Sequence, residues 1–374
     1  MKKKNVSPSI RQKLALNLSA QYINVQAKVH DLTYFFWECT VRCNIACKHC
    51  GSDCRSDKGV KDMPGEDFLK VAKEVATQYD PNKVMIVITG GEPLVRADLA
   101  SVCTELNKMG YPWGMVTNGL LLTREKLDEL LTAGLHSITI SLDGLEESHN
   151  WLRGNERSFA AASKAIKMVA QTPDIAYDVV TCITQKNIHE LEELKSYLIG
   201  LGVTHWRIFA IDPIGRAKDD PMLQISSTQL LEILRFIDMS RREGNIHVSF
   251  GCEGYLGAFE DKVRDGYFFC RAGINIASVL NDGSISACPN NSHHVVQGSI
   301  YTDSFLDVWN NRYQIMRDRS WAKEGTCADC KEFKWCKGNG LHLRDFENHD
   351  VLRCHKKMLE EAINIENNEN NENS

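Results

Sequence analysis

Residues 38–54 read ECTVRCNIACKHCGSDC and directly follow an apolar stretch, Tyr34–Trp37, that predicts a first strand. Within this segment Cys43, Cys47 and Cys50 have the spacing C-x3-C-x2-C. A loop with this spacing can bring three thiolates to one metal cluster, and thiolates are the usual ligands of iron–sulfur clusters. Three ligands leave one iron open for a substrate, whereas four ligands close the site. The alternative is a structural zinc loop, although zinc sites usually take a fourth ligand.

Composition narrows the class of protein. The chain has 374 residues, 14 cysteines, 25% charged residues and a net charge of −5. It is too long for a small disulfide-stapled module, too apolar for a disordered chain, and lacks the basic excess of a dedicated nucleic-acid binder. No apolar run could span a membrane, and Asn17 interrupts the apolar stretch Leu14–Leu18, so we expect no export signal. We therefore expect a cytoplasmic protein with reduced thiols and with neither a nucleic-acid nor a membrane partner.

Short apolar runs alternate with helical patterns after residue 33. The runs expected to be strands are Tyr34–Trp37, Val84–Ile88, Trp113–Val116, Ser137–Leu142, Ala176–Ile183 and His205–Ile211. A helical pattern or a long loop follows each of them. This alternation predicts an α/β fold with a parallel sheet that closes into a barrel or part of one. Chemistry is expected at the carboxyl ends of such strands.

The pattern of the sequence changes near residues 244–252, where the alternation of apolar runs and helical patterns ends and closely spaced cysteines begin. We expect a barrel domain over residues 34–245 and a small cysteine-rich, cluster-binding domain over residues 250–358. The basic residues 1–33 are expected to form a partly disordered arm, with docking to an acidic peptide as the alternative. The Asn/Glu-rich residues 361–374 are expected to be disordered.

The cysteine triplet, its position after the first strand and the motifs that follow it resemble the radical S-adenosylmethionine (SAM) superfamily. The resemblance implies a partial (β/α)6 TIM-type barrel, which agrees with the six expected strands. It also implies that Cys43, Cys47 and Cys50 hold a [4Fe–4S] cluster whose open iron binds SAM. In that family one electron from the cluster cleaves SAM to a 5′-deoxyadenosyl radical, which takes a hydrogen atom from the substrate.

Several turns at strand ends match the SAM-binding motifs of this family. Gly90, Gly91 and Glu92 close the second strand and resemble the GGE motif that takes the SAM amino group, with glycines allowing a close backbone approach. By the same resemblance, the remaining SAM contacts are Ser141 and Asp143 near the ribose, Arg153 at the carboxylate and His49 near the adenine. Arginine suits a bidentate contact to a carboxylate. An ordinary strand-end turn is the alternative for the two ribose contacts.

A second group of cysteines resembles the SPASM domain, a C-terminal extension of some radical SAM enzymes that binds auxiliary clusters. By resemblance, one closed auxiliary [4Fe–4S] cluster has the ligands Cys327, Cys330, Cys336 and Cys354. The family pattern ends in a further cysteine where this chain has Gly340. Cys270 and Cys288 remain for another auxiliary cluster, with Cys252 as a candidate third ligand, so that this site is either absent or three-coordinate. The expected bystanders are Cys39, Cys54, Cys103 and Cys182.

Members of this enzyme group often modify peptides or proteins. We therefore expect a radical SAM/SPASM enzyme that abstracts hydrogen from a peptide or protein and forms a cross-link or an oxidised residue. The implied electron donor is a reductant such as flavodoxin or ferredoxin. About 33 residues precede the barrel, too few for a folded peptide-recognition domain, so recognition would fall to the arm, the barrel mouth or a separate protein.

Three alternatives stay open at this point. A haem precursor is one other substrate within the family. Sulfatase maturation is another, for which a carboxylate base is expected after an auxiliary-cluster cysteine, but Pro289 follows Cys288 here. Outside the family, the chain would be a non-catalytic zinc or iron–sulfur scaffold. No motif assigns a general base.

Overall fold

One sheet runs through the computed structural model, which describes residues 7–57, 59–291 and 293–372. Among these residues the sheet has ten strands in the order β10-β9-β8-β1-β2-β3-β4-β5-β6-β7. The strands from β8 through β1 to β7 pair in parallel, whereas β9 and β10 are antiparallel. The parallel strands are β1 Tyr34–Glu38, β2 Met85–Thr89, β3 Trp113–Thr117, β4 Leu135–Ser141, β5 Ala176–Ile183, β6 His205–Ala210, β7 His247–Phe250 and β8 Ile276–Val279, followed by β9 Ser284–Ser286 and β10 Gly298–Ser299.

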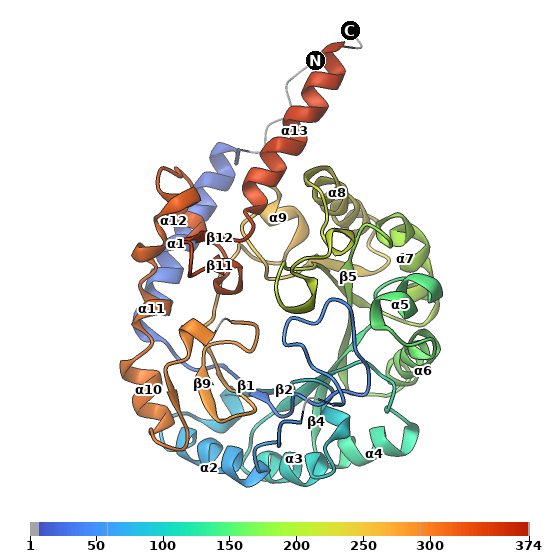
Figure 1. Cartoon of the computed structure of the whole chain (residues 1–374), viewed down its shortest axis with the longest axis vertical. Coiled ribbons are helices and arrows are strands. Elements are labelled where there is room, and N and C mark those ends of the chain that lie inside the picture. The colour runs from blue at the N-terminus through green and yellow to red at the C-terminus, as the bar shows by residue number, and fades with distance from the viewer. Residues whose placement is uncertain (1–6, 58, 292, 373–374) are drawn as a thin grey trace.

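Helices cover the outer side of the parallel strands (Figure 1). They are α2 Gly65–Val75, α3 Leu99–Lys108, α4 Arg124–Thr132, α5 Glu146–Arg153, α6 Ser158–Ala170, α7 Leu191–Gly200 and α8 Ser227–Glu243. Alternate strand residues such as Phe35, Trp37, Ile86 and Ile88 are fully buried in the main apolar core. The predicted alternation of strands and helices is confirmed. Because the strands are parallel, their carboxyl ends open on one edge of the sheet, where the candidate site lies.

The parallel sheet is longer than the six strands expected from the sequence. β7 pairs with β6, and β8 pairs with β1 on the opposite side. The boundary expected at residues 244–252 therefore falls inside the sheet rather than between two separate units. Both added strands have only four residues, too few for a pattern of apolar residues to distinguish them from loops. Strand pairing thus joins the cysteine-rich region to the barrel.

The C-terminal region consists of short elements. β8 and β9 form a hairpin that turns at Asn281–Gly283, where the φ of Gly283 is +83°. The helices are α9 Glu260–Val263, α10 Phe305–Asn311, α11 Gln314–Arg317 and α12 Phe333–Cys336, and β11 Arg344–Asp345 pairs with β12 Asp350–Val351. Trp309 of α10 is fully buried and packs in the main core.

The N-terminal segment is helical where the structure describes it. We expected residues 1–33 to be a partly disordered arm, but α1 spans Ile10–Val29 and begins with a capping box formed by Ser9 and Gln12. Residues 1–6 lie outside the described part of the chain. The sequence concealed this helix because its apolar residues lie on two opposite sides, which weakens the one-sided pattern that marks a surface helix.

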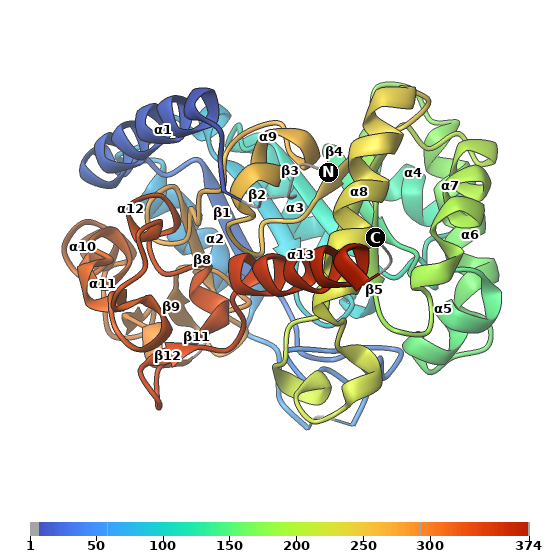
Figure 2. The ribbon, with the colours of Figure 1, turned by 90° about the horizontal axis from the view of Figure 1, so that it is seen from above.

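The C-terminal tail is also helical. α13 spans His355–Glu372, so the disorder expected for residues 361–374 is wrong as far as residue 372. Ala362 and Ile363 are buried, α13 contacts α8, and Arg235 of α8 forms an ion pair with Glu366. These contacts hold a segment whose Asn/Glu-rich composition alone predicts disorder. Figure 2 shows α1 beside the C-terminal elements, with α13 extending from them toward α8.

Candidate active site and metal centres

The structure brings together the three candidate ligands of the cysteine loop. Cys43 and Cys47 are buried in one small cluster, and Cys50 packs against it. Cys54, an expected bystander, joins this cluster, and its backbone N–H donates to the Cys50 Sγ at 3.3 Å. Burial raises the pKa of Cys43 to about 11, and coordination to a metal is what stabilises a thiolate in such a place. The chemistry of these donors therefore fits a metal cluster.

Gly90 and Gly91 let the cysteine loop cross the end of β2. A Cβ at Gly90 would lie 2.2 Å from the Thr40 carbonyl oxygen, and one at Gly91 would lie 2.1 Å from the Arg42 carbonyl oxygen. The same two carbonyls accept hydrogen bonds from Gly91 N at 2.7 Å and Glu92 N at 3.0 Å. We expected these glycines to give a ligand access to the backbone. The structure shows that the close approach is made by the cysteine loop itself.

Glu92 fastens neighbouring strand ends. Its buried carboxylate accepts hydrogen bonds from Thr117 Oγ1 and Asn118 N, both at 2.8 Å, and from Leu94 N at 3.2 Å. Burial raises the pKa of Glu92, although these donors partly offset the effect. The carboxylate therefore ties the end of β2 to the end of β3, which the motif did not predict. Its contact with a SAM amino group stays a prediction.

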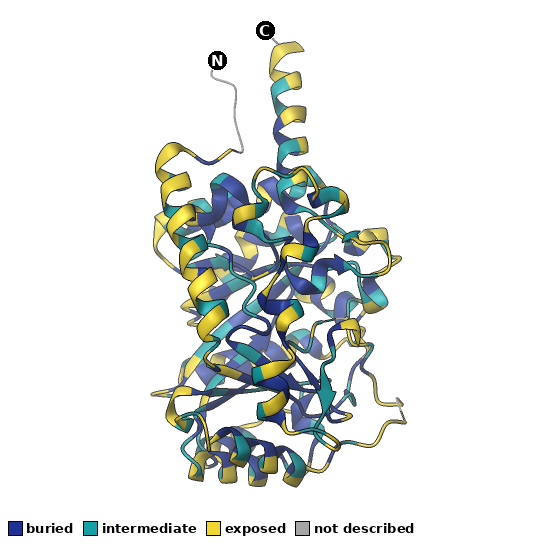
Figure 3. Cartoon of the chain, turned by 90° about the vertical axis from the view of Figure 1, so that its left-hand side faces the viewer, coloured by how far each residue is buried: buried dark blue, intermediate teal, exposed yellow. Residues whose placement is uncertain are grey.

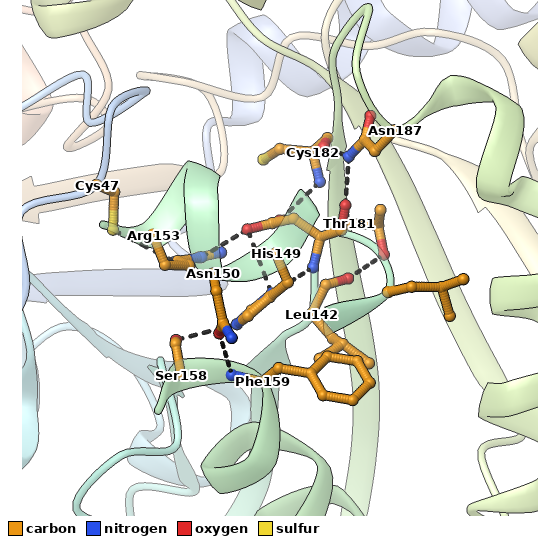
Figure 4. A network of polar contacts seen from close by, with 12 residues as sticks. Cys47, Leu142, His149, Asn150, Arg153, Ser158, Phe159, Thr181, Cys182 and Asn187 are labelled. Carbon is orange, nitrogen blue, oxygen red and sulfur yellow. Dashed lines mark hydrogen bonds and ion pairs between the residues drawn. The ribbon is translucent and has the colours of Figure 1, made fainter. Parts of the chain in front are cut away.

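Asp143 and Arg153 form a buried ion pair. Figure 4 labels Arg153 together with its neighbours Cys47 and His149. Arg153 Nε lies 2.5 Å from Asp143 Oδ2, and Asp143 Oδ1 accepts from Cys182 N at 2.9 Å. Burial alone would raise the pKa of Asp143, but the charge of Arg153 contributes to lowering it to about 2. Arg153 Nη1 also lies 3.8 Å from Cys47 Sγ. The pair thus places a cation beside a candidate cluster ligand, and the expected SAM contacts of both residues, and of buried Ser141, stay predictions.

His149 is a site residue that the sequence reasoning missed. It lies one turn before Arg153 on α5, a spacing that places both side chains on one face of the helix and could have identified it. His149 Nδ1 accepts from Asp143 N at 2.9 Å, so the ring proton resides on Nε2, which lies 3.0 Å from Ser158 Oγ. Burial lowers the pKa of His149 to about 4. A neutral histidine therefore orients the backbone of Asp143.

His49 has an unsatisfied ring nitrogen inside the site. Its buried Nδ1 has no hydrogen-bond partner among the described residues, and burial lowers its pKa to about 4. Ligand atoms of His49, Asp143 and Cys182 lie within 4.8 Å of one another. Cys182 therefore lies at the site, although we expected it to be a bystander. A buried polar atom without a partner is satisfied when a bound group supplies one.

Three further cysteines follow or precede the short strands of the C-terminal region. Cys252 follows β7, Cys270 precedes β8, and Cys288 follows β9. Burial raises the pKa of Cys288 to about 12, and the charges of Cys252 and Cys270 add to this effect. Cys252 and Cys270 likewise interact with each other. The charges of the three thiols thus interact, and their binding of a common cluster stays a prediction.

Four cysteines line one cavity of about 270 Å³ near the C-terminus, namely Cys327, Cys330, Cys336 and Cys354. Polar groups surround their sulfur atoms. Asn339 N donates to Cys336 Sγ at 3.2 Å, and Arg344 Nη1 lies 3.9 Å from Cys327 Sγ. Hydrogen bonds and positive charge of this kind stabilise cluster thiolates.

Comparison with known families agrees with this arrangement. Residues 37–198 match the model of the radical SAM superfamily, and residues 270–331 match that of SPASM, an iron–sulfur cluster-binding domain. The chain is a radical SAM enzyme with a SPASM domain. The first match begins near the end of β1 and covers the cysteine loop and the strands β2 to β5, and the second begins at Cys270.

Three proteins illustrate the similarity. The AdoMet-dependent heme synthase of Nitratidesulfovibrio vulgaris is 25% identical over 320 residues, covering 81% of this chain and 85% of the synthase. Mycofactocin maturase MftC of Mycobacterium tuberculosis is 28% identical over 319 residues, covering 83% and 78%. The crystal structure of Streptococcus suis SuiB bound to the precursor peptide SuiA has a TM-score of 0.68 at 18% identity, covering 90% and 80%. The last likeness confirms the fold.

A radical SAM domain implies a [4Fe–4S] cluster with SAM, and a SPASM domain implies auxiliary clusters. The residues of this chain fit such groups. Three thiols converge in the cysteine loop without a fourth ligand on its spacing, Arg153 supplies a cation next to Cys47, and His49 offers an unpartnered nitrogen. The four-cysteine cavity fits a closed auxiliary cluster.

Gly340 departs from the SPASM pattern for a structural reason. A Cβ at this position would lie 2.6 Å from the His342 ring and 2.8 Å from the Glu253 carbonyl oxygen. Glu253 is the residue after Cys252, and its carboxylate accepts from Ala210 N at 2.5 Å. The loop that carries Cys252 therefore packs where a cysteine side chain at position 340 would begin.

A cavity of about 700 Å³ separates the cysteine loop from the SPASM domain. Gly51 and Ser52 line it from the loop side, and Pro213–Gly215 from the segment after β6. The charged side chains around it are Glu38, Lys218, Asp282, Arg344, Asp345 and Glu347, together with His293, His294 and His342. Carboxylates and cations are thus mixed around the space between the candidate SAM site and the SPASM domain.

Asp212 is a second residue that the sequence reasoning missed. It lies two residues after β6, at the carboxyl edge of the sheet. Its Oδ2 lies 3.5 Å from His342 Nε2, whereas its buried Oδ1 has no hydrogen-bond partner among the described residues. Burial raises the pKa of Asp212. Only its position after a strand could have identified it, because its partner comes from the distant SPASM domain.

Proposed function

We propose that this radical SAM/SPASM enzyme abstracts hydrogen from a peptide or protein and leaves a cross-link or an oxidised residue. The observation that carries this proposal is the mixed charge of the 700 Å³ cavity beside the cysteine loop. A peptide presents both backbone donors and acceptors and side chains of either sign, which suits such a lining. A haem precursor that is decarboxylated on its side chains would instead favour an excess of cations.

The roles of the site residues are part of this proposal. When bound, the cluster and SAM supply a radical that removes a hydrogen atom from the substrate. Cys43, Cys47 and Cys50 hold that cluster, while Gly90 and Gly91 position the loop. The Asp143–Arg153 pair keeps a fixed cation next to Cys47 Sγ. Because both charges are buried and paired, they are pre-oriented and need no water to stabilise them.

Further SAM contacts belong to the same proposal. Glu92 and Ser141 lie at the ends of β2 and β4, and His49 lies in the cysteine loop. The unpartnered Nδ1 of His49 supports a hydrogen bond to the bound cofactor. On the auxiliary side, we propose the closed cluster on the four cysteines of the 270 Å³ cavity and a second, three-coordinate cluster on Cys252, Cys270 and Cys288.

We place Asp212 as the candidate proton acceptor. Oxidation of the substrate radical left by hydrogen abstraction would release one electron, for which an auxiliary iron–sulfur cluster is the proposed acceptor, and one proton. Asp212 Oδ1 is a buried carboxylate oxygen without a partner among the described residues. His342 contacts the other oxygen and can stabilise either charge state. Asp212→Asn should therefore lower the ratio of modified peptide to 5′-deoxyadenosine by about 100-fold, as expected for general-base catalysis. Asp219→Asn, on the exposed part of the same segment, is the control.

Relatives support a peptide substrate. Mycofactocin maturase is one, and SuiB, which has the same fold, has been crystallised with a precursor peptide. The heme synthase relative supports the alternative, a haem precursor. Flavodoxin or ferredoxin as reductant and a cytoplasmic location complete the proposal. None of the described helices is long and apolar enough to cross a membrane.

One experiment tests the choice of substrate. Reconstituted enzyme receives dithionite, SAM and either a candidate peptide or a haem precursor, and mass spectrometry follows each of them together with 5′-deoxyadenosine. We expect a mass shift in the peptide. Conversion of the haem precursor alone would overturn the peptide proposal. A protein that contains zinc without sulfide and leaves SAM intact would overturn radical chemistry as a whole.

A further inference from the structure

Helix α1 presents an apolar stripe to solvent along its whole length. The side chains, which we call the outer stripe, are Ile10, Leu14, Leu18, Tyr22, Val25 and Val29. They are between 51% and 89% exposed, and they make up six of the fifteen large apolar side chains exposed in the described part of the chain. The other nine are spread over the rest of the molecule. A contiguous exposed patch of this kind marks an interaction surface, whereas scattered residues do not.

The stripe is not the result of a loosely attached helix. The opposite side of α1 buries Leu16 and Ile23, and Asn17 Oδ1 accepts from Trp335 Nε1 at 2.8 Å. Gln12 Nε2 donates to the Ala258 carbonyl at 3.0 Å. Figure 3 shows the exposed residues along α1, the helix that follows the grey N-terminal trace. The outer stripe is therefore held in place and faces away from the molecule.

Charge determines which partner the stripe fits. α1 contains three exposed cations, Arg11, Lys13 and Lys28, and no acidic residue, although the whole chain has a net charge of −5. Within the described residues none of these cations forms an ion pair. A second copy of α1 would fit poorly. Antiparallel pairing would place Arg11 next to Lys28, and parallel pairing would place each cation next to the same residue of the other copy. An acidic partner would be attracted to both ends of the stripe.

Length gives the form of that partner. The residues from Ile10 to Val29 rise about 1.5 Å each, so the stripe is about 28 Å long. Its spacing of three or four residues matches the apolar side of an amphipathic helix, and two such sides pack against each other. Tyr22 contacts the ring of Phe269, with centroids 6.4 Å apart, and Phe269 precedes the candidate ligand Cys270. The outer stripe thus contacts the SPASM domain through Tyr22 and Phe269.

We infer that α1 docks an acidic, amphipathic helical segment of the peptide or protein substrate, outside the residues that react. This inference rests on the proposed peptide substrate and assigns its recognition to α1. It also accounts for the absence of an acidic residue in a helix of an acidic chain. The acidic segment would tether the substrate while the reacting part enters the cavity beside the cysteine loop.

Binding of a defined probe tests this inference without SAM or reductant. The probe is a fluorescein-labelled, 20-residue helical peptide with leucines three and four residues apart and glutamates at the remaining positions. Its affinity for the reconstituted full-length enzyme is measured by anisotropy. Leu14→Glu with Leu18→Glu should weaken binding at least tenfold. The matched control, Ile199→Glu with Met239→Glu, introduces the same charges at exposed apolar positions of α7 and α8 and should bind like the wild type.

A charge swap provides the second arm. Arg11→Glu with Lys28→Glu should lose affinity for the glutamate probe and gain affinity for the same peptide with lysines. Equal binding of both probes to the wild type, or no loss in the Leu14/Leu18 variant, would overturn the inference. So would failure of the wild type to bind the glutamate probe.

Two rival occupants have their own readouts. A dimer that sedimentation shows for the wild type but not for the Leu14/Leu18 variant would assign the stripe to a second copy. If the wild type floats with vesicles of phosphatidylcholine and phosphatidylserine, the Leu14/Leu18 variant does not, and neither binds the probe, the stripe would be assigned to a lipid surface. Either result overturns the inference. The proposed function fails separately, through absent SAM cleavage or an absent peptide mass shift in the wild type.

Discussion

The cysteine loop and the auxiliary cysteine sites are held by different kinds of contact. The loop with Cys43, Cys47 and Cys50 is one short segment, fastened to the end of β2 by backbone hydrogen bonds that require Gly91. The auxiliary cysteines come from segments far apart in the sequence, and short helices and hairpins bring them together. The first site is therefore determined by local backbone geometry, and the others by assembly of the whole C-terminal region. Substitutions should affect the two kinds of site separately.

The largest effect is expected from removing the ligands of the loop. Replacing Cys43, Cys47 and Cys50 together by alanine should abolish 5′-deoxyadenosine formation, because no thiolate remains to hold the cluster. Iron analysis should show the loss of one cluster, with the auxiliary iron retained. Cys103→Ala, in the main core, is the control. SAM cleavage by the triple variant would show that the loop is not the SAM site.

Crowding the loop should have the next largest effect. A methyl group at Gly91 would lie 2.1 Å from the Arg42 carbonyl oxygen, and overpacking of this kind costs about 1–3 kcal/mol. Gly91→Ala should therefore lower the yield of SAM-responsive cluster, measured by EPR after reduction, by about tenfold. Gly200→Ala is the matched control, because nothing lies within 4 Å of a Cβ there. Equal losses in the auxiliary signals would contradict the separation of the sites.

A pH-dependent effect on stability is expected from His149. Burial lowers its pKa from 6.5 to about 4, so between these values the unfolded chain binds a proton that the folded chain does not. Stability should therefore fall as the pH falls through this window, by up to about 3 kcal/mol. His149→Asn keeps an acceptor for Asp143 N but cannot titrate. The free energy of unfolding of this variant, measured with urea, should therefore change less between these pH values than that of the wild type. Parallel curves for both proteins would refute this assignment.

The smallest effect is expected at the three-cysteine auxiliary site. Cys252→Ala should lower the iron content by at most one cluster per chain, since only one of the proposed clusters uses this thiol. The iron that remains should include the cluster on Cys327 and its three partners. If iron content is the same as in Cys103→Ala, then Cys270 and Cys288 hold no cluster with Cys252.

The sequence predicts the strands of the barrel better than it predicts the helices at the two ends of the chain. Strands such as Ala176–Ile183 have the predicted bounds, because a long apolar run between turn residues has few other solutions. The helices α1 and α13 were missed because tertiary contacts stabilise them. Leu16 of α1 packs on Tyr255, Phe268 and Trp335 of the C-terminal region, and Arg235 pairs with Glu366. Such contacts join residues that are distant in the sequence and leave no local pattern.

The candidate site shows the same division. Cysteine spacing and the GGE motif are local signals, and the structure brings their residues together. The contacts of Glu92 with Thr117 and of Asp212 with His342 are not local, so their effects on charge and geometry could not be read from either residue alone. Resemblance to the family assigned Arg153 to SAM but did not reveal its ion pair with Asp143.

The pairing of β8 with β1 limits how the chain can be divided. β1 is an interior strand only because Tyr34–Trp37 pair with Ile276–Val279 on one side and with β2 on the other. A fragment that ends after β7 would expose the backbone of β1 as a free edge, and such edges promote aggregation. The barrel and the SPASM domain therefore share one sheet, and β1, the strand that leads into the cysteine loop, joins the strands of the two.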